Sequence, residues 1–292
     1  GDVYKRQTYK TIPGPSLTLT ESTIFAGTDA KKGVPVQIES VRGVHEVVIY
    51  RIENGSEVEA LRETKNGEHT LNYAPEIDFT EATSKLKVVV SDGREGKEAI
   101  GYVKAYVNMD VATLNVGSQP LANNAHVKYP DAFGMVSLND LKTYSVDYAI
   151  ANEVNAKNVD FKFYCFGASG SPRLYSMDNT GKDGEFSGST GKLSAIKVKN
   201  LTRFAILSNF DYENATVASI SSEILSSSIA QSLLDPIAVG NVIAFRTGGS
   251  SAAGGGRIGV MKVINITEPK ELVSNNATAR VMTVEIKFPK KK

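Results

Sequence analysis

Two asparagine–glycine pairs occur in the first third of the chain. The alternating and apolar residue runs around them limit this region to β structure. Residues 16–20 alternate strictly between polar and apolar side chains, and the apolar run at residues 46–53 ends at Asn54–Gly55. A second pair, Asn66–Gly67, follows it. A period of two is typical of a strand with one buried face, and Asn-Gly is the strongest short-range signal for a hairpin. No helical spacing competes with this pattern, so we predict an all-β region.

Further strands are predicted at residues 35–41, 86–90 and 99–107, with Asp92–Gly93 as a third hairpin turn. About seven short strands in roughly ninety residues are typical of an immunoglobulin-like β-sandwich. The chain has one cysteine and no tryptophan, so it lacks the disulfide and the core tryptophan of antibody domains. We therefore predict an immunoglobulin-like β-sandwich over residues 8–108.

The composition changes after residue 108, and we place a domain boundary between residues 107 and 111. The second domain, residues 109–289, is predicted to be a mixed α+β module with antiparallel strands and about two helices. Residues 140–155 and 219–234 carry apolar side chains at mostly helical spacing. Residues 290–292 are three lysines, which we expect to form a solvated basic tail.

The strands predicted in the second domain share apolar, often β-branched runs. They are expected at residues 159–164, 203–207, 239–247, 257–266 and 279–288. Residues 167–191 contain Ser-Gly-Ser-Pro and Asp-Asn-Thr-Gly and are predicted to form a long loop region. The chain as a whole is therefore expected to be mainly β.

Both halves resemble modules of secreted and surface proteins of the Bacteroidota phylum. In the first half the resemblance rests on residues 34–38, 44–50 and 86–93, which match an immunoglobulin-like module. The second half, roughly residues 110–289, resembles a C-terminal module of uncharacterised Bacteroidota surface lipoproteins. That similarity is carried by the order of residues 144–149, 158–161, Ser171–Pro172, 202–204 and 239–247. The resemblance implies a location in the bacterial cell envelope, at the outer surface or in the periplasm, and no catalytic residues.

Residues 1–7, Gly-Asp-Val-Tyr-Lys-Arg-Gln, resemble a translated sequencing adaptor. We expect them to be foreign to the natural protein. An export signal or a lipid anchor would then lie upstream of this sequence, and any membrane attachment would depend on that lost anchor.

The charge balance argues against nucleic-acid binding, because 33 Lys and Arg residues oppose 32 Asp and Glu residues. No apolar run approaches the roughly 20 residues of a membrane-spanning helix. Cys165 lies in an apolar run and is expected to be a buried thiol. The three histidines are scattered, so we predict neither a metal site nor a cofactor.

Catalytic motifs are weak. Gly254, Gly256 and Gly259 satisfy G-x-G-x-x-G, but β-branched residues follow where a dinucleotide site needs a helix. No serine-hydrolase elbow is present, and no pair of carboxylates has apolar surroundings. We predict that the protein is not an enzyme. A hydrolase whose site forms only on folding stays as an alternative.

Aromatic side chains beside carboxylates and amides are typical of sugar-binding surfaces. Such residues cluster in the middle of the second domain, and Tyr175 and Tyr212 have polar neighbours that suggest exposure. The predicted ligand-binding residues are Tyr175, Tyr212, Arg173, Asp178, Asn179 and Asp211.

From these patterns we predict a non-catalytic binding or scaffold protein of the cell envelope. Its partner would be a polysaccharide or another surface protein. A structural adhesin-type or assembly subunit is the main alternative, in which both domains present protein surface. An exposed tyrosine platform would favour the first hypothesis, whereas an open edge strand would favour assembly.

Overall fold

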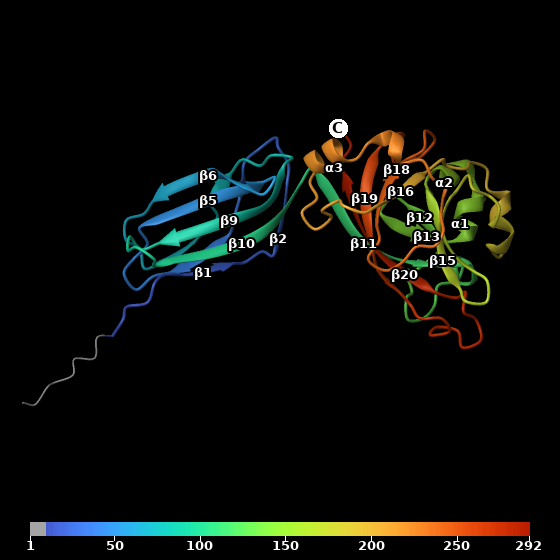
Figure 1. Ribbon diagram of the computed structural model, residues 1–292, viewed down its shortest axis with the longest axis horizontal. Coiled ribbons are helices and arrows are strands. Elements are labelled where there is room, and N and C mark those ends of the chain that lie inside the picture. Colours follow the sequence, from blue (N-terminus) through green and yellow to red (C-terminus); the bar gives the residue numbers. More distant parts are fainter. Residues whose placement is uncertain (1–9) are drawn as a thin grey trace, which may run out of the picture. The chain divides into compact units, whose positions relative to one another are not determined.

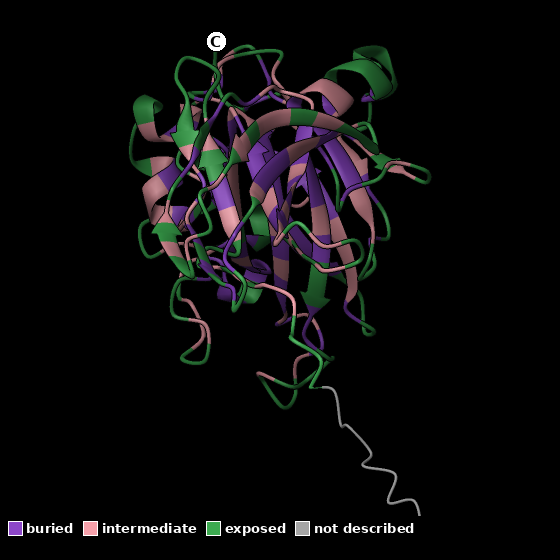
Figure 2. Cartoon of the chain, turned by 90° about the vertical axis from the view of Figure 1, so that its left-hand side faces the viewer, coloured by how far each residue is buried: buried purple, intermediate pink, exposed green. Residues whose placement is uncertain are grey.

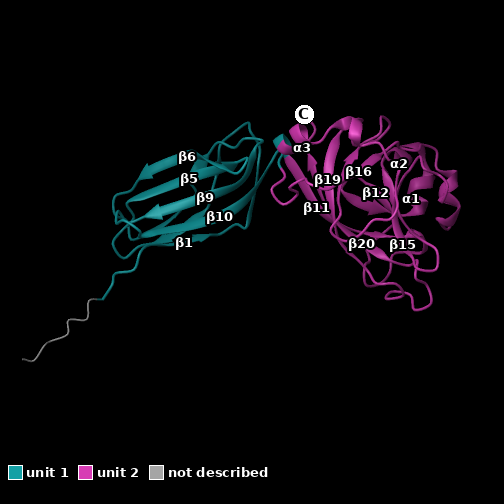
Figure 3. Ribbon diagram, viewed as in Figure 1, with its two compact units in different colours: residues 1–108, 216–218 teal, residues 109–215, 219–292 magenta. Residues whose placement is uncertain are grey.

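The computed structural model describes residues 10–292 (Figure 1), so the segment predicted to derive from an adaptor, residues 1–7, lies outside the described residues. Contacts divide the chain into two compact units (Figure 3). Unit 1 extends to Asn108 and includes Thr216–Ala218, and unit 2 contains Met109–Ala215 and Ser219–Lys292. The division after Asn108 falls within the interval predicted from the sequence.

Unit 1 consists of two β-sheets that share one core. The smaller sheet contains β1 (Ser16–Leu19), β4 (Val36–Glu39) and β7 (Thr70–Tyr73), in that order. The larger contains β2 (Thr23–Ala26), β10 (Glu98–Val107), β9 (Thr83–Ser91), β5 (Glu46–Glu53) and β6 (Ser56–Thr64). All neighbours are antiparallel except β2 and β10, and β3 (Lys32–Gly33) pairs with β8 (Glu76–Ile77). Apart from the parallel edge strand β2, the order corresponds to strands A, B and E opposite G, F, C and C′ of an immunoglobulin-like sandwich.

Strand β9 shows the alternation that was predicted for unit 1. Leu86, Val88 and Val90 are fully buried, whereas Lys85 and Lys87 on the opposite face are partly exposed. The buried face joins a core to which both sheets contribute (Figure 2). Each buried valine or leucine contributes about 1.5–3 kcal/mol, so one apolar stripe per strand stabilises the sandwich.

Two of the three predicted hairpin turns are confirmed. Asn54 and Gly55 have φ angles of 51° and 80° and join β5 to β6, and Asp92–Gly93 opens the connection from β9 to β10. The third prediction, a hairpin at Asn66–Gly67, is wrong because β6 and β7 belong to different sheets. There the Gly67 N–H donates to the carbonyl of Val44 at 3.1 Å, and the chain crosses between sheets.

Unit 2 is built on two five-stranded antiparallel sheets. The first contains β11 (Met109–Gly117), β20 (Val281–Pro289), β19 (Ile258–Ile266), β18 (Val242–Arg246) and β16 (Arg203–Leu207), in that order. The second contains β13 (Lys142–Tyr144), β12 (Met135–Ser137), β14 (Phe161–Phe166), β15 (Ser171–Ser176) and β17 (Leu233–Leu234). The strands predicted near residues 159–164, 203–207, 239–247, 257–266 and 279–288 are all present.

A core rich in phenylalanine fills the space between these two sheets. Phe161 of β14 meets Phe204 of β16 edge to face, with ring centroids 5.6 Å apart. Phe245 of β18 and Phe288 of β20 are similarly placed at 5.1 Å. All four side chains are buried in one cluster to which both sheets contribute. Unit 2 is therefore also a sandwich, and the chain is mainly β, as predicted.

A layer of short helices covers the other face of the β14 sheet. It contains α1 (Val146–Ala151), α2 (Glu153–Lys157), η2 (Asp183–Glu185) and η3 (Leu193–Ala195). Their side chains form a second core with Tyr164 of β14 and Tyr175 of β15. The remaining helices are η1 (Gln119–Leu121), α3 (Val217–Glu223) and η4 (Ser226–Ser228). Strands β14 and β15 are thus covered on both faces.

The two predicted helices are present only in part. In the first region, residues 142–144 form β13, the helix begins after the Ser145 cap, and Asn152 is extended and divides α1 from α2. In the second, α3 ends at Glu223, and Leu234 pairs with Leu174 of β15. Pairing with a neighbouring strand outweighs helical spacing at both places, because it satisfies backbone groups that a short helix end would leave free.

The predicted loop region at residues 167–191 was also partly wrong, because it contains β15. Pro172 suggested a turn, yet it lies in the strand opposite Cys165. Its carbonyl accepts a hydrogen bond from the Ile237 N–H at 2.9 Å. Among residues 10–292, none of the helices has the length and apolar character needed to cross a membrane.

Candidate functional site

Tyr175, a predicted sugar-binding platform, is only 4% exposed. It packs edge to face against Tyr164, with ring centroids 5.5 Å apart, beneath the helical layer. The Arg173 guanidinium donates to its hydroxyl at 3.3 Å. The expectation of exposure was wrong because polar neighbours in the sequence do not show that helices cover this face of the sheet.

Tyr212, the second predicted platform, is also 4% exposed. Its hydroxyl donates to the backbone carbonyl of Glu285 at 2.9 Å, and the Lys287 ammonium lies 4.1 Å from its ring centroid. Lys287 also donates to the Tyr212 carbonyl at 2.7 Å. Tyr212 therefore fastens the segment after β16 onto β20, and its ring is not available for stacking on a sugar.

The other four predicted residues make local structural pairs. Arg173 lies 2.9 Å from Asp235, and Asp211 accepts a hydrogen bond from the Asn214 N–H. Asp178 accepts two hydrogen bonds from Arg203, both at 2.9 Å. Burial alone would raise the pKa of Asp178, but the bonds from Arg203 and Ser176 hold it below its usual range. Asn179 donates to Ser232. Each of the six side chains is thus engaged in a contact within unit 2.

The deeply buried ionisable groups of unit 2 also bear on the hydrolase alternative. Asp160 is fully buried, and it accepts hydrogen bonds from the Leu138 N–H at 2.8 Å and the Ser251 hydroxyl at 2.6 Å. Burial raises its pKa to about 6. Lys162 and Asp183 form a buried ion pair at 2.6 Å, and burial lowers the pKa of Lys162. These contacts join the strands to the loops that cover them, which is a structural role.

Burial raises the pKa of the Cys165 thiol to about 12, so this side chain is a poor nucleophile. Its backbone N–H and C=O are both bonded to the side-chain amide of Gln119. Within residues 10–292, no three histidine, cysteine or acidic side chains are grouped so that they could hold a metal ion.

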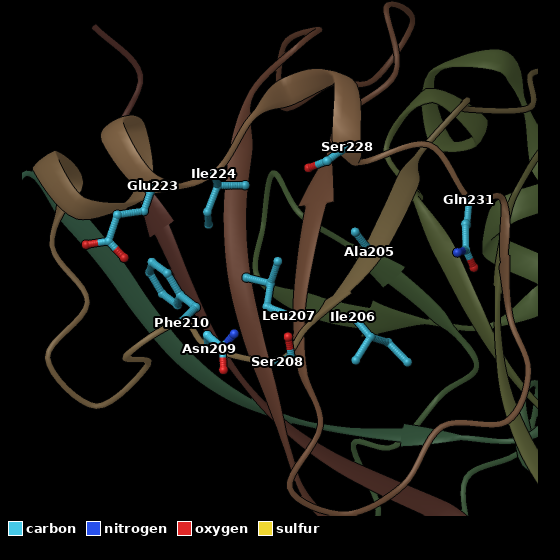
Figure 4. Close-up of a pocket in the computed structure, with 10 residues that line it drawn as sticks. All are labelled: Ala205, Ile206, Leu207, Ser208, Asn209, Phe210, Glu223, Ile224, Ser228 and Gln231. Atoms are coloured by element: carbon cyan, nitrogen blue, oxygen red, sulfur yellow. The ribbon is translucent and has the colours of Figure 1, made fainter.

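A groove of about 530 Å³ runs along β16 at the edge of its sheet (Figure 4). We call it the β16 groove. The residues that line it are Ala205, Ile206, Leu207, Ser208, Asn209, Phe210, Glu223, Ile224, Ser228 and Gln231. Most of the lining is apolar or uncharged, and Glu223 is the one ionised side chain. None of the residues that we predicted from the sequence lies in it.

Every second residue of β16 directs its backbone N–H and C=O groups toward this groove. Phe204 exchanges two hydrogen bonds with Gln231, of 2.8 and 3.0 Å, on the side away from β18. In an antiparallel sheet, every second residue directs its N–H and C=O to the same side. Ile206 and Ser208 therefore direct theirs outward as well. On the side away from β18, the described residues form no pairing with β16 beyond this single bridge at Gln231.

Ile206 lies on the core face of its sheet and is nevertheless 47% exposed. It is directly opposite Ile243 of β18, which is fully buried in the core, and two residues from the fully buried Phe204. Residues two apart on a strand share a face. The interior of unit 2 is consequently open to solvent beside Ile206, where one more strand would cover it.

Glu223 stands near one end of the groove lining (Figure 4). Of the ion pairs formed by the described residues, none includes Glu223. The sequence identified β16 as a strand but could not show that it lies at an edge, because that depends on which strands pair. The one available signal was the uncharged run at residues 204–207.

Comparison of the chain with protein-family models and with curated proteins finds no match. Functional inference for this protein therefore depends on its geometry.

Proposed function

We propose that the protein is a non-catalytic assembly or scaffold protein whose unit 2 binds an extended segment of another polypeptide along β16. The single observation that supports this most directly is Ile206, a core-face residue at an open sheet edge. Addition of a strand to such an edge is an established mode of peptide recognition, in which the main chain supplies affinity and alternate side chains supply specificity.

The edge of β16 has backbone hydrogen-bonding groups, an apolar side chain and a nearby carboxylate that an extended polypeptide could contact. The N–H and C=O groups of Ile206 and Ser208 would form up to four hydrogen bonds, each contributing about 0.5–1.5 kcal/mol net. A side chain placed opposite Ile206 would face the core, so an apolar residue suits that position. The carboxylate of Glu223 favours a lysine or arginine elsewhere in the segment.

The envelope location is part of the same proposal and rests on the resemblance to Bacteroidota surface proteins. Binding of a polysaccharide by unit 2 is the weaker hypothesis, because Tyr175 and Tyr212 are buried and Phe210 is the one aromatic residue that lines the groove. A strand of protein fits the groove better, since it satisfies the backbone groups of Ile206 and Ser208.

A selection from a phage-displayed peptide library on the full chain tests the proposal. We expect peptides with apolar residues at alternate positions, and we expect binding to be lost in Ile206→Pro. Proline is tolerated on an edge strand where the N–H points outward, so this variant should fold while lacking the donor. In hydrogen exchange, the amides of Ile206 and Ser208 should become protected when a selected peptide binds.

Ile206→Val is the matched control, because it keeps both the backbone donor and a β-branched apolar side chain. It should bind selected peptides nearly as well as the original protein. A library that yields no peptide able to distinguish the original chain from Ile206→Pro would contradict strand addition at this edge.

A further inference from the structure

The outer face of the larger sheet of unit 1 carries an exposed row of aromatic and basic side chains. Tyr102 of β10 is directly opposite Lys87 of β9, which in turn is directly opposite Tyr50 of β5. Tyr102 is 57% exposed, and Tyr50 is partly exposed. The two tyrosines are separated by one strand, or about 10 Å. Both tyrosines lie on the outer face of the sheet.

The next row of the same face places two lysines opposite each other. Lys85 of β9 is the direct partner of Lys104 of β10. Like charges in this relation are destabilising, and neither lysine takes part in an ion pair among the described residues. Lys87 differs, since Glu57 neutralises it at 2.7 Å. Among the described residues, Lys85 and Lys104 therefore hold positive charge that no carboxylate neutralises.

The lysines and the aromatic rings are close enough to act on one ligand. The Lys85 ammonium lies 5.5 Å from the ring centroid of the exposed Tyr102, and the Lys104 ammonium lies 5.3 Å from that of Tyr106, which is buried and only supports the lysine. A sugar ring stacks its C–H face on an aromatic side chain, and an acidic sugar adds a carboxylate or sulfate for an ammonium group. Aromatic rings beside ammonium groups complement both the sugar rings and the anionic groups of an acidic glycan. A neutral glycan has no anionic group with which the lysines could pair.

We propose that this face of unit 1 binds an acidic polysaccharide, with Tyr102 and Tyr50 stacking on sugar rings and Lys85 and Lys104 pairing with their anionic groups. An open sheet face with successive rows of side chains suits a polymer better than a small molecule, which needs a concave site. A nucleic acid is disfavoured because the chain has a net charge of only +1. This proposal is independent of the strand-binding role of β16.

Binding of the full chain to immobilised polygalacturonate, a polymer of a uronic acid, tests the proposal. Fully methyl-esterified polygalacturonate is the matched ligand, because it keeps the sugar ring and removes the charge. We expect retention on the acidic polymer alone, weakening as salt is raised. The double variant Lys85→Gln plus Lys104→Gln should lose at least about tenfold in affinity.

Two further comparisons distinguish binding at this face from unspecific attraction to the positive charge of the protein. Tyr102→Ala should weaken binding several-fold more than Tyr102→Phe, which keeps the stacking ring. Lys31→Gln plus Lys128→Gln removes two exposed lysines elsewhere and should leave binding unchanged. Thermal unfolding of the Lys85/Lys104 variant at the same or a higher temperature would show that it is folded, since the change removes an unfavourable contact.

Three results would overturn the proposal. One is the absence of retention on polygalacturonate and also on chondroitin sulfate. Another is equal affinity of the Lys85/Lys104 variant and its control for the acidic polymer. The third is equally tight binding of duplex DNA or of anionic lipid vesicles, which would indicate unspecific attraction to polyanions.

Discussion

Two edge strands, β6 in unit 1 and β16 in unit 2, show how differently a sheet can end. β6 carries four charged side chains, at Glu57, Glu59, Arg62 and Glu63, and Arg62 pairs with Glu46 at 2.7 Å. A bulge also interrupts its pairing with β5. Charges and bulges are the usual means by which proteins prevent an edge from pairing with another chain.

The exposed part of β16 has neither protection. Ala205, Ile206 and Leu207 carry no charge, and its register with β18 is regular. Arg203, the one charge of the strand, is already paired with Asp178. The comparison teaches that β16 lacks both charges and a bulge at the place where a core-face side chain is exposed, which is what strand addition requires.

The largest expected effect compares two residues on the same face of β16. Phe204→Ala should lower the free energy of unfolding by about 3–5 kcal/mol, because it leaves a cavity in the core. Ile206→Ala should cost only about 1 kcal/mol, because half of that side chain already meets water. Urea unfolding of both variants measures the difference. Equal costs would mean that the sheet edge is closed at Ile206.

The stabilities of unit 1 and unit 2 should depend differently on pH. Buried ionisable side chains occur in unit 2, whereas the buried polar residues described in unit 1 are uncharged. The folded pKa of Asp160, about 6, exceeds its ordinary value of 3.8. Folding therefore favours the protonated form, so the contribution of Asp160 to stability should be greatest below pH 4 and decrease as the pH rises to about 6. The total change is roughly 3 kcal/mol.

Urea unfolding between pH 4 and pH 7 measures this loss. Asp160→Asn should remove most of the pH dependence, since the Ser251 hydroxyl can reverse to accept a hydrogen bond from the amide. A variant that keeps the full dependence would show that another group is responsible.

A smaller effect is expected when β16 is made to resemble β6. Ile206→Lys places a charge at the open edge and should weaken binding of a selected peptide by about tenfold, while stability changes by less than about 1 kcal/mol. Titration of the labelled peptide into both proteins gives the two affinities. Undiminished binding would place the peptide elsewhere.

The smallest effect is expected from the reverse change in unit 1. Glu59→Val plus Arg62→Val removes the ion pairs that join Arg62 to Glu46 and to Glu59, and it makes residues 58–62 of β6 apolar, while Glu57 and Glu63 keep their charges. Weak self-association should then appear at high protein concentration in sedimentation experiments, as the protection of the edge is lost. Glu21→Val plus Lys31→Val, which changes as many charges outside the strands, is the control.

The sequence by itself determined the local elements of this protein. The hairpin at Asn54–Gly55 and the strands β18 and β19 follow from side-chain alternation and turn chemistry, which act between residues close together in the chain. The mainly β class and the division near Asn108 could be predicted for the same reason.

Only the tertiary structure decided which surfaces are exposed. Tyr175 is buried because helices cover its face of the sheet, and Tyr212 is buried because β20 lies beside it. Ile206 is exposed because its sheet ends at β16. Each outcome depends on contacts between segments far apart in the sequence. The period of a strand specifies that its residues have two faces, but only its packed neighbours specify which face meets water.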